Sequence, residues 1–262
     1  MDIVLLGNHE GSKLAAEKQG IAIVVDTLRA STTMPVAMDK GIDTLYVALE
    51  VEDTRLAAKE FGTLLMGERG CNLLEGFNYG NSPLELQKLD GFTSNIASFT
   101  SSTGARRIVD AIGAQVIIVG SPINAQAVVS YIQSLRQSSE IEQKTIVIIP
   151  AFSEGSIISN EITEDQIGGL IIAREFKRAG FLITQEISEE IDFLENMLKN
   201  QSLSAILLQT KHGQTLIELG YKDDVYYCSR INEINAVPAS INDTPVLANG
   251  IKVVKLEKFQ IK

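Results

Sequence analysis

Hydrophobic residues in this chain gather in short runs that polar turns separate. The run Ile21-Ala-Ile-Val-Val25 is rich in β-branched residues and predicts a strand that is covered on both faces. After it, the apolar residues between positions 34 and 38 fit a helix that ends at Gly41. Similar patterns predict strands at residues 3–7, 44–47, 63–66, 96–100, 116–119, 145–149, 205–208, 225–228 and 251–256, and helices at 51–61, 123–135, 188–198 and 215–219.

The order of strand, polar turn and helix recurs after Val25, Met66, Thr100, Val119 and Ile149. Such alternation predicts an α/β fold in which a mainly parallel sheet lies between helices, a layered α/β/α architecture. We predict two closely packed lobes, 1–150 with most of the site and 151–262, or one compact unit. Open α/β sheets bind ligands beyond the carboxyl ends of their parallel strands, so we expect the site in these turns.

The turn after Val25 combines a carboxylate (Asp26), a guanidinium (Arg29) and three hydroxyls (Ser31 to Thr33). They lie where a helix N-terminus leaves backbone N–H groups unpaired, so an anion could bind there. Each residue alone could equally cap the helix or cover apolar surface. Together they exceed what capping requires, and we interpret this turn as part of a ligand site.

Two further turns carry polar side chains next to glycine or proline. Glycines flank Glu68 and Arg69, and their backbone freedom would allow both side chains to point into a cleft. An ion-paired surface turn is the alternative. In the other turn, Ser82 begins a capping box, which gives it a structural explanation that the neighbouring Asn81 lacks.

Another helix is predicted to start at Thr163 as its N-cap, which places Glu164 and Asp165 in the first turn, where acids complement the helix dipole. If the strands of the repeats share one sheet and one direction, the polar turns meet at one edge. The candidate site residues are Asp26, Arg29, Thr32, Thr33, Glu68, Arg69, Asn81, Ser82, Ser101, Ser102, Gly104, Ser121, Asn124 and Asp165.

The composition narrows the class of partner. With 262 residues, 45% of them hydrophobic, the chain can build a large core, and its net charge of −10 argues against nucleic acid or an anionic membrane surface as a partner. Cys71 and Cys228 suggest no disulfide framework, and we see no signal peptide or apolar run of about 20 residues. We expect a soluble cytoplasmic protein, with a homodimer as the assembly to consider. His9 and His212 are expected to be solvated turn residues.

The candidate residues point to phosphoester chemistry. Carboxylates suit a hard cation such as Mg²⁺, whereas hydroxyls, arginine and helix N-termini suit phosphoryl oxygens. No histidine and no thiol pair is among the candidates, which argues against zinc or thiol chemistry. The expected ligand is a small anionic phosphorylated substrate.

Several motifs together carry a resemblance to a known family. They are Asp26-x-x-Arg29-Ala30-x-Thr32-Thr33, Gly67-Glu68-Arg69, Gly76-Phe77, Gly80-Asn81-Ser82-Pro83, Gly120-Ser121, Asn124-Ala125 and Glu164-Asp165. In this order they resemble the 2-phosphosulfolactate phosphatases of coenzyme M biosynthesis, a class of Mg²⁺-dependent acid phosphatases, over most of the chain. The resemblance implies hydrolysis of 2-phosphosulfolactate to sulfolactate and phosphate.

The site residues then take the following expected roles. Asp26 would bind Mg²⁺ or act directly on phosphorus, with Glu68 and Asp165 as further metal ligands or as the acid or base. Arg29, Arg69 and the hydroxyls would bind phosphoryl oxygens. The Asp-x-Asp signature of phosphatases that form a phosphoaspartate is absent, so the nucleophile stays open between Asp26 and a metal-bound water.

One segment suggests an alternative function. Residues 101–105 read Ser-Ser-Thr-Gly-Ala where the family's Thr-Thr-Asn-Gly-Thr is expected, so one amide and one hydroxyl are missing. The alternative is a diverged, non-catalytic paralogue that binds a small anionic ligand in a regulatory role.

Overall fold

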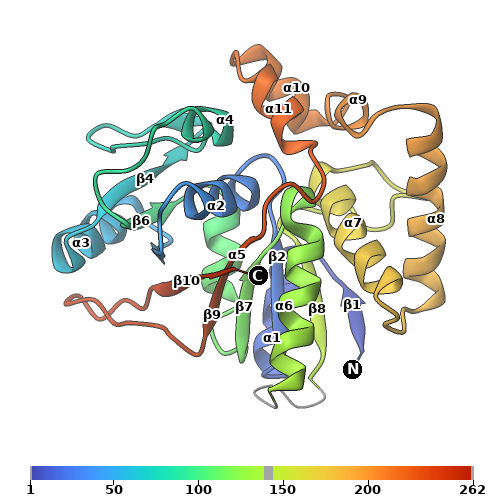
Figure 1. Ribbon diagram of the computed structural model, residues 1–262, viewed down its shortest axis with the longest axis horizontal. Helices are drawn as coiled ribbons and strands as arrows, with labels where there is room; N and C mark the ends of the chain where they lie inside the picture. The colour runs from blue at the N-terminus through green and yellow to red at the C-terminus, as the bar shows by residue number, and fades with distance from the viewer. Residues whose placement is uncertain (1, 139–143, 261–262) are drawn as a thin grey trace.

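The computed structural model describes residues 2–138 and 144–260, which form a ten-stranded sheet with helices on both faces (Figure 1). The strand order across the sheet is β1-β8-β2-β7-β9-β10-β3-β6-β4-β5. The strands are β1 (Ile3–Leu5), β2 (Ile21–Val25), β3 (Thr44–Val47), β4 (Leu64–Arg69), β5 (Asn72–Leu73), β6 (Ile96–Thr100), β7 (Val116–Val119), β8 (Ile146–Pro150), β9 (Ala236–Ile241) and β10 (Val254–Gln260). The predicted layered α/β/α architecture is confirmed.

The sheet consists of two parallel blocks. The first block contains β1, β8, β2 and β7, and the second contains β3, β6 and β4. Strands β9 and β10 lie between the blocks and pair antiparallel to each neighbour, so the second block runs opposite to the first. The expectation of one shared strand direction is therefore wrong.

Sheet twist explains why the turns of both blocks nevertheless meet. Neighbouring strands rotate by roughly 20–25°, so the five pairings from β2 to β6 accumulate a rotation of roughly 100–125°. This rotation offsets much of the reversal in direction. The carboxyl ends of β2 and β8 consequently border the same cavity as those of β4 and β6.

Strand β2 shows how both faces of the sheet are covered. Ile21, Ile23 and Val25 pack into one apolar cluster, Ala22 and Val24 pack into another, and all five side chains are buried, as predicted. Helices on the first face are α6 (Ala125–Gln137), α7 (Glu164–Arg178) and α8 (Gln185–Asn200), and those on the second are α1 (Asn8–Glu17), α2 (Ala30–Asp39) and α5 (Gly104–Asp110). Helix α3 (Val51–Phe61) packs against β6, and α4 (Pro83–Gln87) against α2.

Three short helices lie together above the sheet in Figure 1: α9 (Leu203–Leu207), α10 (Lys211–Glu218) and α11 (Lys222–Cys228). The strands predicted at 205–208 and 225–228 are therefore wrong. Short apolar runs fit either type of element, and at residues 205–208 a helix cap favours the helix. The side chains of Ser202 and Thr210 accept backbone N–H bonds at the starts of α9 and α10.

Other local differences have similarly local causes. Helix α1 contains His9, which was expected in a turn, and Pro35 lies inside α2. Strand β9, which the sequence did not indicate, contains Pro238, a residue without the N–H that a central strand normally uses. Strands β9 and β10 come from residues 151–262 but lie in the middle of the sheet. Within residues 2–138 and 144–260, no helix is both long and apolar enough to cross a bilayer.

Candidate active site

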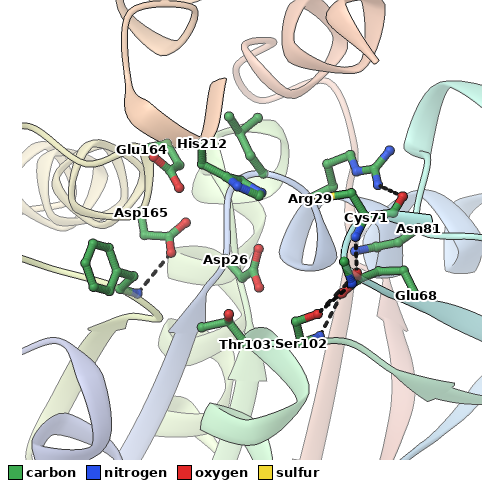
Figure 2. Close-up of a pocket in the computed structure, with 13 residues that line it drawn as sticks. Asp26, Arg29, Glu68, Cys71, Asn81, Ser102, Thr103, Glu164, Asp165 and His212 are labelled. Atoms are coloured by element: carbon green, nitrogen blue, oxygen red, sulfur yellow. Dashed lines mark hydrogen bonds between the residues drawn. The ribbon is translucent and has the colours of Figure 1, made fainter. Parts of the chain in front are cut away.

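A cavity of about 340 Å³ lies between the carboxyl ends of the two parallel blocks (Figure 2). Its lining combines four carboxylates with one guanidinium and one imidazole. The lining residues are Asp26, Leu28, Arg29, Glu68, Gly70, Cys71, Asn81, Ser102, Thr103, Phe152, Glu164, Asp165 and His212. All four residues predicted as catalytic are therefore brought together, and Asn81 and Ser102 of the predicted phosphate-binding set join them.

Two buried aspartates form one wall of the cavity. Asp26 follows β2 directly, and its Oδ1 accepts a backbone hydrogen bond from Ala30, at 3.3 Å. Asp165 lies in the first turn of α7, which Thr163 caps as predicted. Its Oδ1 accepts from Thr27 N at 2.7 Å, and its Oδ2 accepts from Phe152 N at 3.0 Å. Asp165 thus fixes the turns after β2 and β8 relative to α7.

The electrostatic environment disfavours the ionised form of both aspartates. Burial is the main cause that raises the pKa of Asp26 to about 6, with Glu68 and Glu164 adding repulsion and His212 opposing it. Burial, followed by repulsion from Asp26 and Glu164, also raises the pKa of Asp165 well above its ordinary value. A cation in this part of the cavity would stabilise both carboxylates.

His212 is a cavity residue that the sequence interpretation missed. It lies in the first turn of α10, where Thr210 Oγ1 accepts a hydrogen bond from Gly213 N at 3.1 Å. A Cβ at Gly213 would lie 2.0 Å from Leu207 O, so only glycine fits this close turn. His212 consequently extends toward Asp26 (Figure 2) instead of lying in a solvated turn. Thr210, the N-cap two residues before His212, is the sequence signal that could have placed His212 in the first turn of a helix.

The other histidine is not part of the cavity. His9 lies in α1, its side chain is 61% exposed, and its Nδ1 is 3.3 Å from Asp110 Oδ2. It is thus solvated as expected, although it does have an acidic neighbour.

Glu68 lies on the opposite wall of the cavity, where its carboxylate accepts three hydrogen bonds from described residues. Its carboxylate accepts from Cys71 N and Ser102 N, both at 2.7 Å, and from Ser102 Oγ at 3.2 Å. Gly67 has a φ of +140°, and a Cβ there would lie 2.1 Å from Thr100 O. The glycine before Glu68 therefore permits β4 to approach β6 closely, and this approach sets where Glu68 points.

Arg29 lies on the same wall and is almost completely buried. One guanidinium nitrogen, Nη1, donates to Asp224 Oδ2 at 2.7 Å, and Nη2 donates to Cys71 O at 3.0 Å. The ring of Tyr221 stacks against the guanidinium, 4.2 Å from its centroid to Cζ. Sequence reasoning missed both Asp224 and Tyr221, because they lie almost 200 residues away in a segment that was predicted as strand and turn.

The remaining predicted hydroxyl groups do not line the cavity, and they form hydrogen bonds with other protein atoms. Thr32 Oγ1 donates to Thr27 O and lies within hydrogen-bond distance of Ser121 Oγ, at 3.2 Å, and Thr33 Oγ1 donates to Asn81 O. Ser101 Oγ accepts from the backbone of α5, and Ser82 Oγ accepts from Glu85 N while donating to Asp224. These hydroxyls connect neighbouring turns, and that use of them explains why they are buried.

Three other predicted residues also support the site from outside the lining. Arg69 points away and donates to Leu49 O and Thr100 Oγ1. Asn124 accepts from Ser121 N, which closes its own turn. Gly104 approaches Asp26 so closely that a Cβ would lie 2.7 Å from Asp26 Oδ2.

The donor chemistry of the cavity fits Mg²⁺, although no group of three or more His, Cys, Asp or Glu in residues 2–138 and 144–260 is arranged to hold a metal by itself. Mg²⁺ commonly takes one or two carboxylates, keeps several waters and uses substrate phosphate as a ligand. Asp26 and Asp165 offer such carboxylates, and Glu164 adds a third. The buried Asn81 Oδ1 has no hydrogen-bond partner in the described part of the chain.

Comparison with known proteins identifies the family. The profile described as 2-phosphosulpholactate phosphatase matches residues 8–243. A protein of Carboxydothermus hydrogenoformans named probable 2-phosphosulfolactate phosphatase is 31% identical over 246 residues, 91% of this chain and 92% of the relative. Relatives with the same name from Caldanaerobacter subterraneus (30% identical, covering 89% of this chain and 90% of the relative) and Clostridium perfringens (28%, covering 97% and 98%) also match. The chain therefore belongs to the 2-phosphosulpholactate phosphatase family, whose name denotes a phosphoric monoester hydrolase.

Proposed function

We propose that this protein is a Mg²⁺-dependent phosphatase that hydrolyses a small phosphorylated organic acid, with 2-phosphosulfolactate as the substrate that its relatives' names indicate. We place it in the cytoplasm and in coenzyme M biosynthesis. The observation that carries the proposal is the pair of buried aspartates with raised pKa values beside a buried arginine in one cavity. A cation stabilises paired carboxylates that repel each other, and phosphoryl transfer uses both a cation and directed donors.

The carboxylates on the Asp26 wall would hold the metal. Asp26 and Asp165 are the main candidates, and Glu164 lies beside them. Glu68, the third ligand expected from the sequence, already accepts three hydrogen bonds from Cys71 and Ser102, so its role is to hold its own wall in place. When bound, Mg²⁺ supplies positive charge that offsets the negative charge of the phosphoryl oxygens.

Arg29 would orient the phosphoryl group. A guanidinium has five N–H donors, and hydrogen bonds to described residues engage Nη1 and Nη2 once each. The remaining donors can bind a ligand oxygen in the cavity. His212 and Asp26 both line the cavity, and we assign to them the retention or transfer of protons during the reaction.

The direct test is phosphate release from p-nitrophenyl phosphate and from phosphorylated 2-hydroxy acids. We expect turnover with Mg²⁺, loss of turnover after chelation with EDTA, and recovery when Mg²⁺ is added back. Turnover that persists after thorough chelation would contradict the metal role. Binding without turnover under all conditions would support the non-catalytic alternative. The names of the family and of the relatives do not favour it, although Thr103, which replaces the expected amide, lines the cavity, whereas Ala105 does not.

A further inference from the structure

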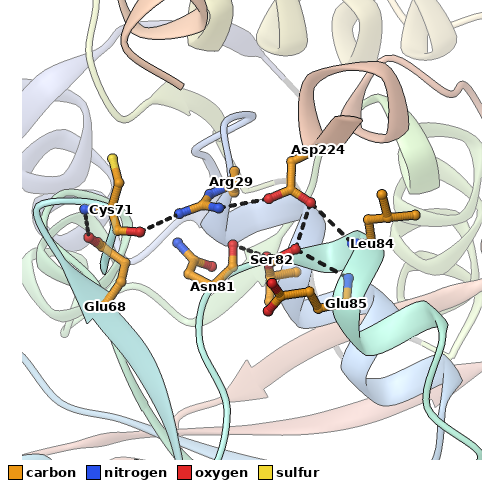
Figure 3. Close-up of polar contacts among 9 residues, drawn as sticks. Arg29, Glu68, Cys71, Asn81, Ser82, Leu84, Glu85 and Asp224 are labelled. Atoms are coloured by element: carbon orange, nitrogen blue, oxygen red, sulfur yellow. Dashed lines mark hydrogen bonds and ion pairs between the residues drawn. The ribbon is translucent and has the colours of Figure 1, made fainter. Parts of the chain in front are cut away.

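The carboxylate of Asp224 connects the cavity to the scaffold beside it (Figure 3). Its Oδ2 accepts from Arg29 Nη1 at 2.7 Å. Its Oδ1 accepts from Ser82 Oγ at 2.7 Å and from Leu84 N at 3.3 Å. Only 2% of the Asp224 side chain is exposed, so each of these bonds forms away from bulk water. One side chain from α11 thus binds both the start of α4 and the residue that precedes α2.

The start of α11 holds Arg29 from two directions. Asp224 binds one end of the guanidinium, while the ring of Tyr221, three residues earlier, covers its face at 4.2 Å. Asp224 N donates to Tyr221 O at 3.0 Å, which sets these two residues relative to each other. Cys71 O accepts a hydrogen bond from Nη2, the other terminal nitrogen of Arg29, at 3.0 Å. Three contacts from two segments, the start of α11 and the turn at Cys71, therefore limit the orientation of the guanidinium.

This arrangement changes what Arg29 can offer a ligand. Its positive charge is compensated at 2.7 Å by Asp224, so Arg29 adds little net charge to a cavity that contains four other carboxylates. Its planar fork is nevertheless fixed, and a fixed fork presents its free N–H donors in one direction. The value of Arg29 to the site thus depends on its orientation.

We propose that Asp224 is a positioning residue, which fixes the direction in which Arg29 presents its donors to the phosphoryl group of the substrate. This inference rests on the proposed function, because it needs a phosphate in the cavity. It assigns to Asp224 a role that the sequence did not indicate. Asp224 acts through Arg29 and does not itself line the cavity.

A double-mutant cycle tests the inference with inorganic phosphate as the binding probe and p-nitrophenyl phosphate as the substrate. Arg29→Ala should raise the Kd for phosphate about 30-fold, since it removes the N–H donors for the phosphate oxygens and leaves the charge of Asp224 uncompensated. Asp224→Asn should raise it about 10-fold, because the amide cannot accept from Arg29 while also accepting from Ser82 and Leu84. The double variant should bind phosphate no more weakly than Arg29→Ala alone.

The cycle separates positioning from stability. If Asp224 acted independently of Arg29, the two effects on Kd would add, and this result would overturn the proposal. So would an Asp224→Asn variant that binds phosphate as tightly as wild type. Glu175→Gln is the matched control, because it also breaks a buried ion pair, with Arg174 on α7, at residues outside the cavity lining. It should lower the melting temperature and leave the Kd unchanged.

A conservative variant keeps the test decisive if Asp224→Asn does not fold. Asp224→Glu retains the charge and moves the carboxylate by one methylene, so it should displace the guanidinium and give a Kd between those of wild type and Asp224→Asn. A wild-type Kd for Asp224→Glu would overturn the proposal. Wild-type hydrolysis is a separate readout. Its absence contradicts the proposed function, whereas turnover in wild type with no coupling between Asp224 and Arg29 contradicts only the role of Asp224.

Discussion

The charged side chains on the two walls of the cavity differ in how many protein partners they have. On the first wall, Asp26 accepts one long hydrogen bond and is repelled by neighbouring acids, so its pKa rises to about 6. On the second wall, Glu68 accepts three hydrogen bonds and Arg29 has an ion-pair partner at 2.7 Å. The comparison shows that burial alone does not identify a reactive group. The first wall has charge that a ligand can still compensate, whereas the second wall is compensated by the protein itself.

The largest expected effect is on the first wall. Asp26→Asn preserves the shape of the side chain and removes its charge, so turnover should fall about 10³-fold or more. The free energy of unfolding at pH 8 should not decrease, because the variant removes a carboxylate whose ionisation burial opposes. Steady-state kinetics and urea unfolding of the same preparations check both parts. Turnover near the wild-type value would limit Asp26 to a capping role.

The pH dependence of stability is the second prediction and concerns metal-free protein. Folded Asp26 keeps a proton that the unfolded chain releases between pH 3.8 and about 6. Stability relative to Asp26→Asn should therefore fall by about 3 kcal/mol as the pH rises through this window, and level off above it. Urea unfolding of both proteins in EDTA from pH 4 to 8 measures the difference. Added Mg²⁺ should reverse the fall, and a difference that rises with pH would contradict the burial argument.

The third prediction concerns the second wall. In Glu68→Gln only one side-chain oxygen can still accept, so a partly buried N–H of Cys71 or Ser102 loses its partner. The cost in free energy of unfolding should be about 1–3 kcal/mol. Turnover of the folded variant should fall much less than in Asp26→Asn. A loss of turnover equal to that of Asp26→Asn would mean that Glu68 takes part in the reaction. The contrast between the first and second walls would then be contradicted.

The smallest expected effect belongs to His212. Its charge opposes the rise in the pKa of Asp26, so His212→Gln should raise that pKa further. The acid limb of the pH–rate profile would then move to higher pH, if ionised Asp26 is the active form. His9→Gln is the control, because His9 lies outside the cavity lining and should leave the profile unchanged. A profile that does not move in His212→Gln would separate His212 from Asp26.

The sequence predicts best those parts of the chain where local chemistry is decisive. Five β-branched and small apolar residues from Ile21 to Val25 allow little other than a buried strand, and the caps at Ser82 and Thr163 start helices where expected. It fails at residues 205–208 and 225–228, whose apolar runs suit strand and helix alike. Both segments are helical in the fold and pack Ile206, Leu207, Val225 and Cys228 into one buried apolar cluster.

In the candidate site, too, residues whose position depends on local sequence could be predicted, and residues whose position depends on the tertiary fold could not. The residues that line the cavity could be predicted where they directly follow a strand, as Asp26 does, or begin a helix, as Asp165 does. The neighbour that orients Arg29 could not, because Asp224 joins it only through the tertiary fold. Nor does the sequence reveal which hydroxyls face a ligand. Thr32 and Ser121 lie beyond predicted strands, but they bind each other.

The position of β9 and β10 has a consequence for how this protein is made. Every residue that lines the cavity is translated before Ala236, where β9 begins, yet within the sheet β9 and β10 are the strands that pair the two parallel blocks. A nascent chain therefore exposes the open edges of β7 and β3 while it waits for the two closing strands. Edges of this kind pair with other chains, and such long-range closure is slow. The site should assemble late, after the ribosome has released the strands that unite its walls.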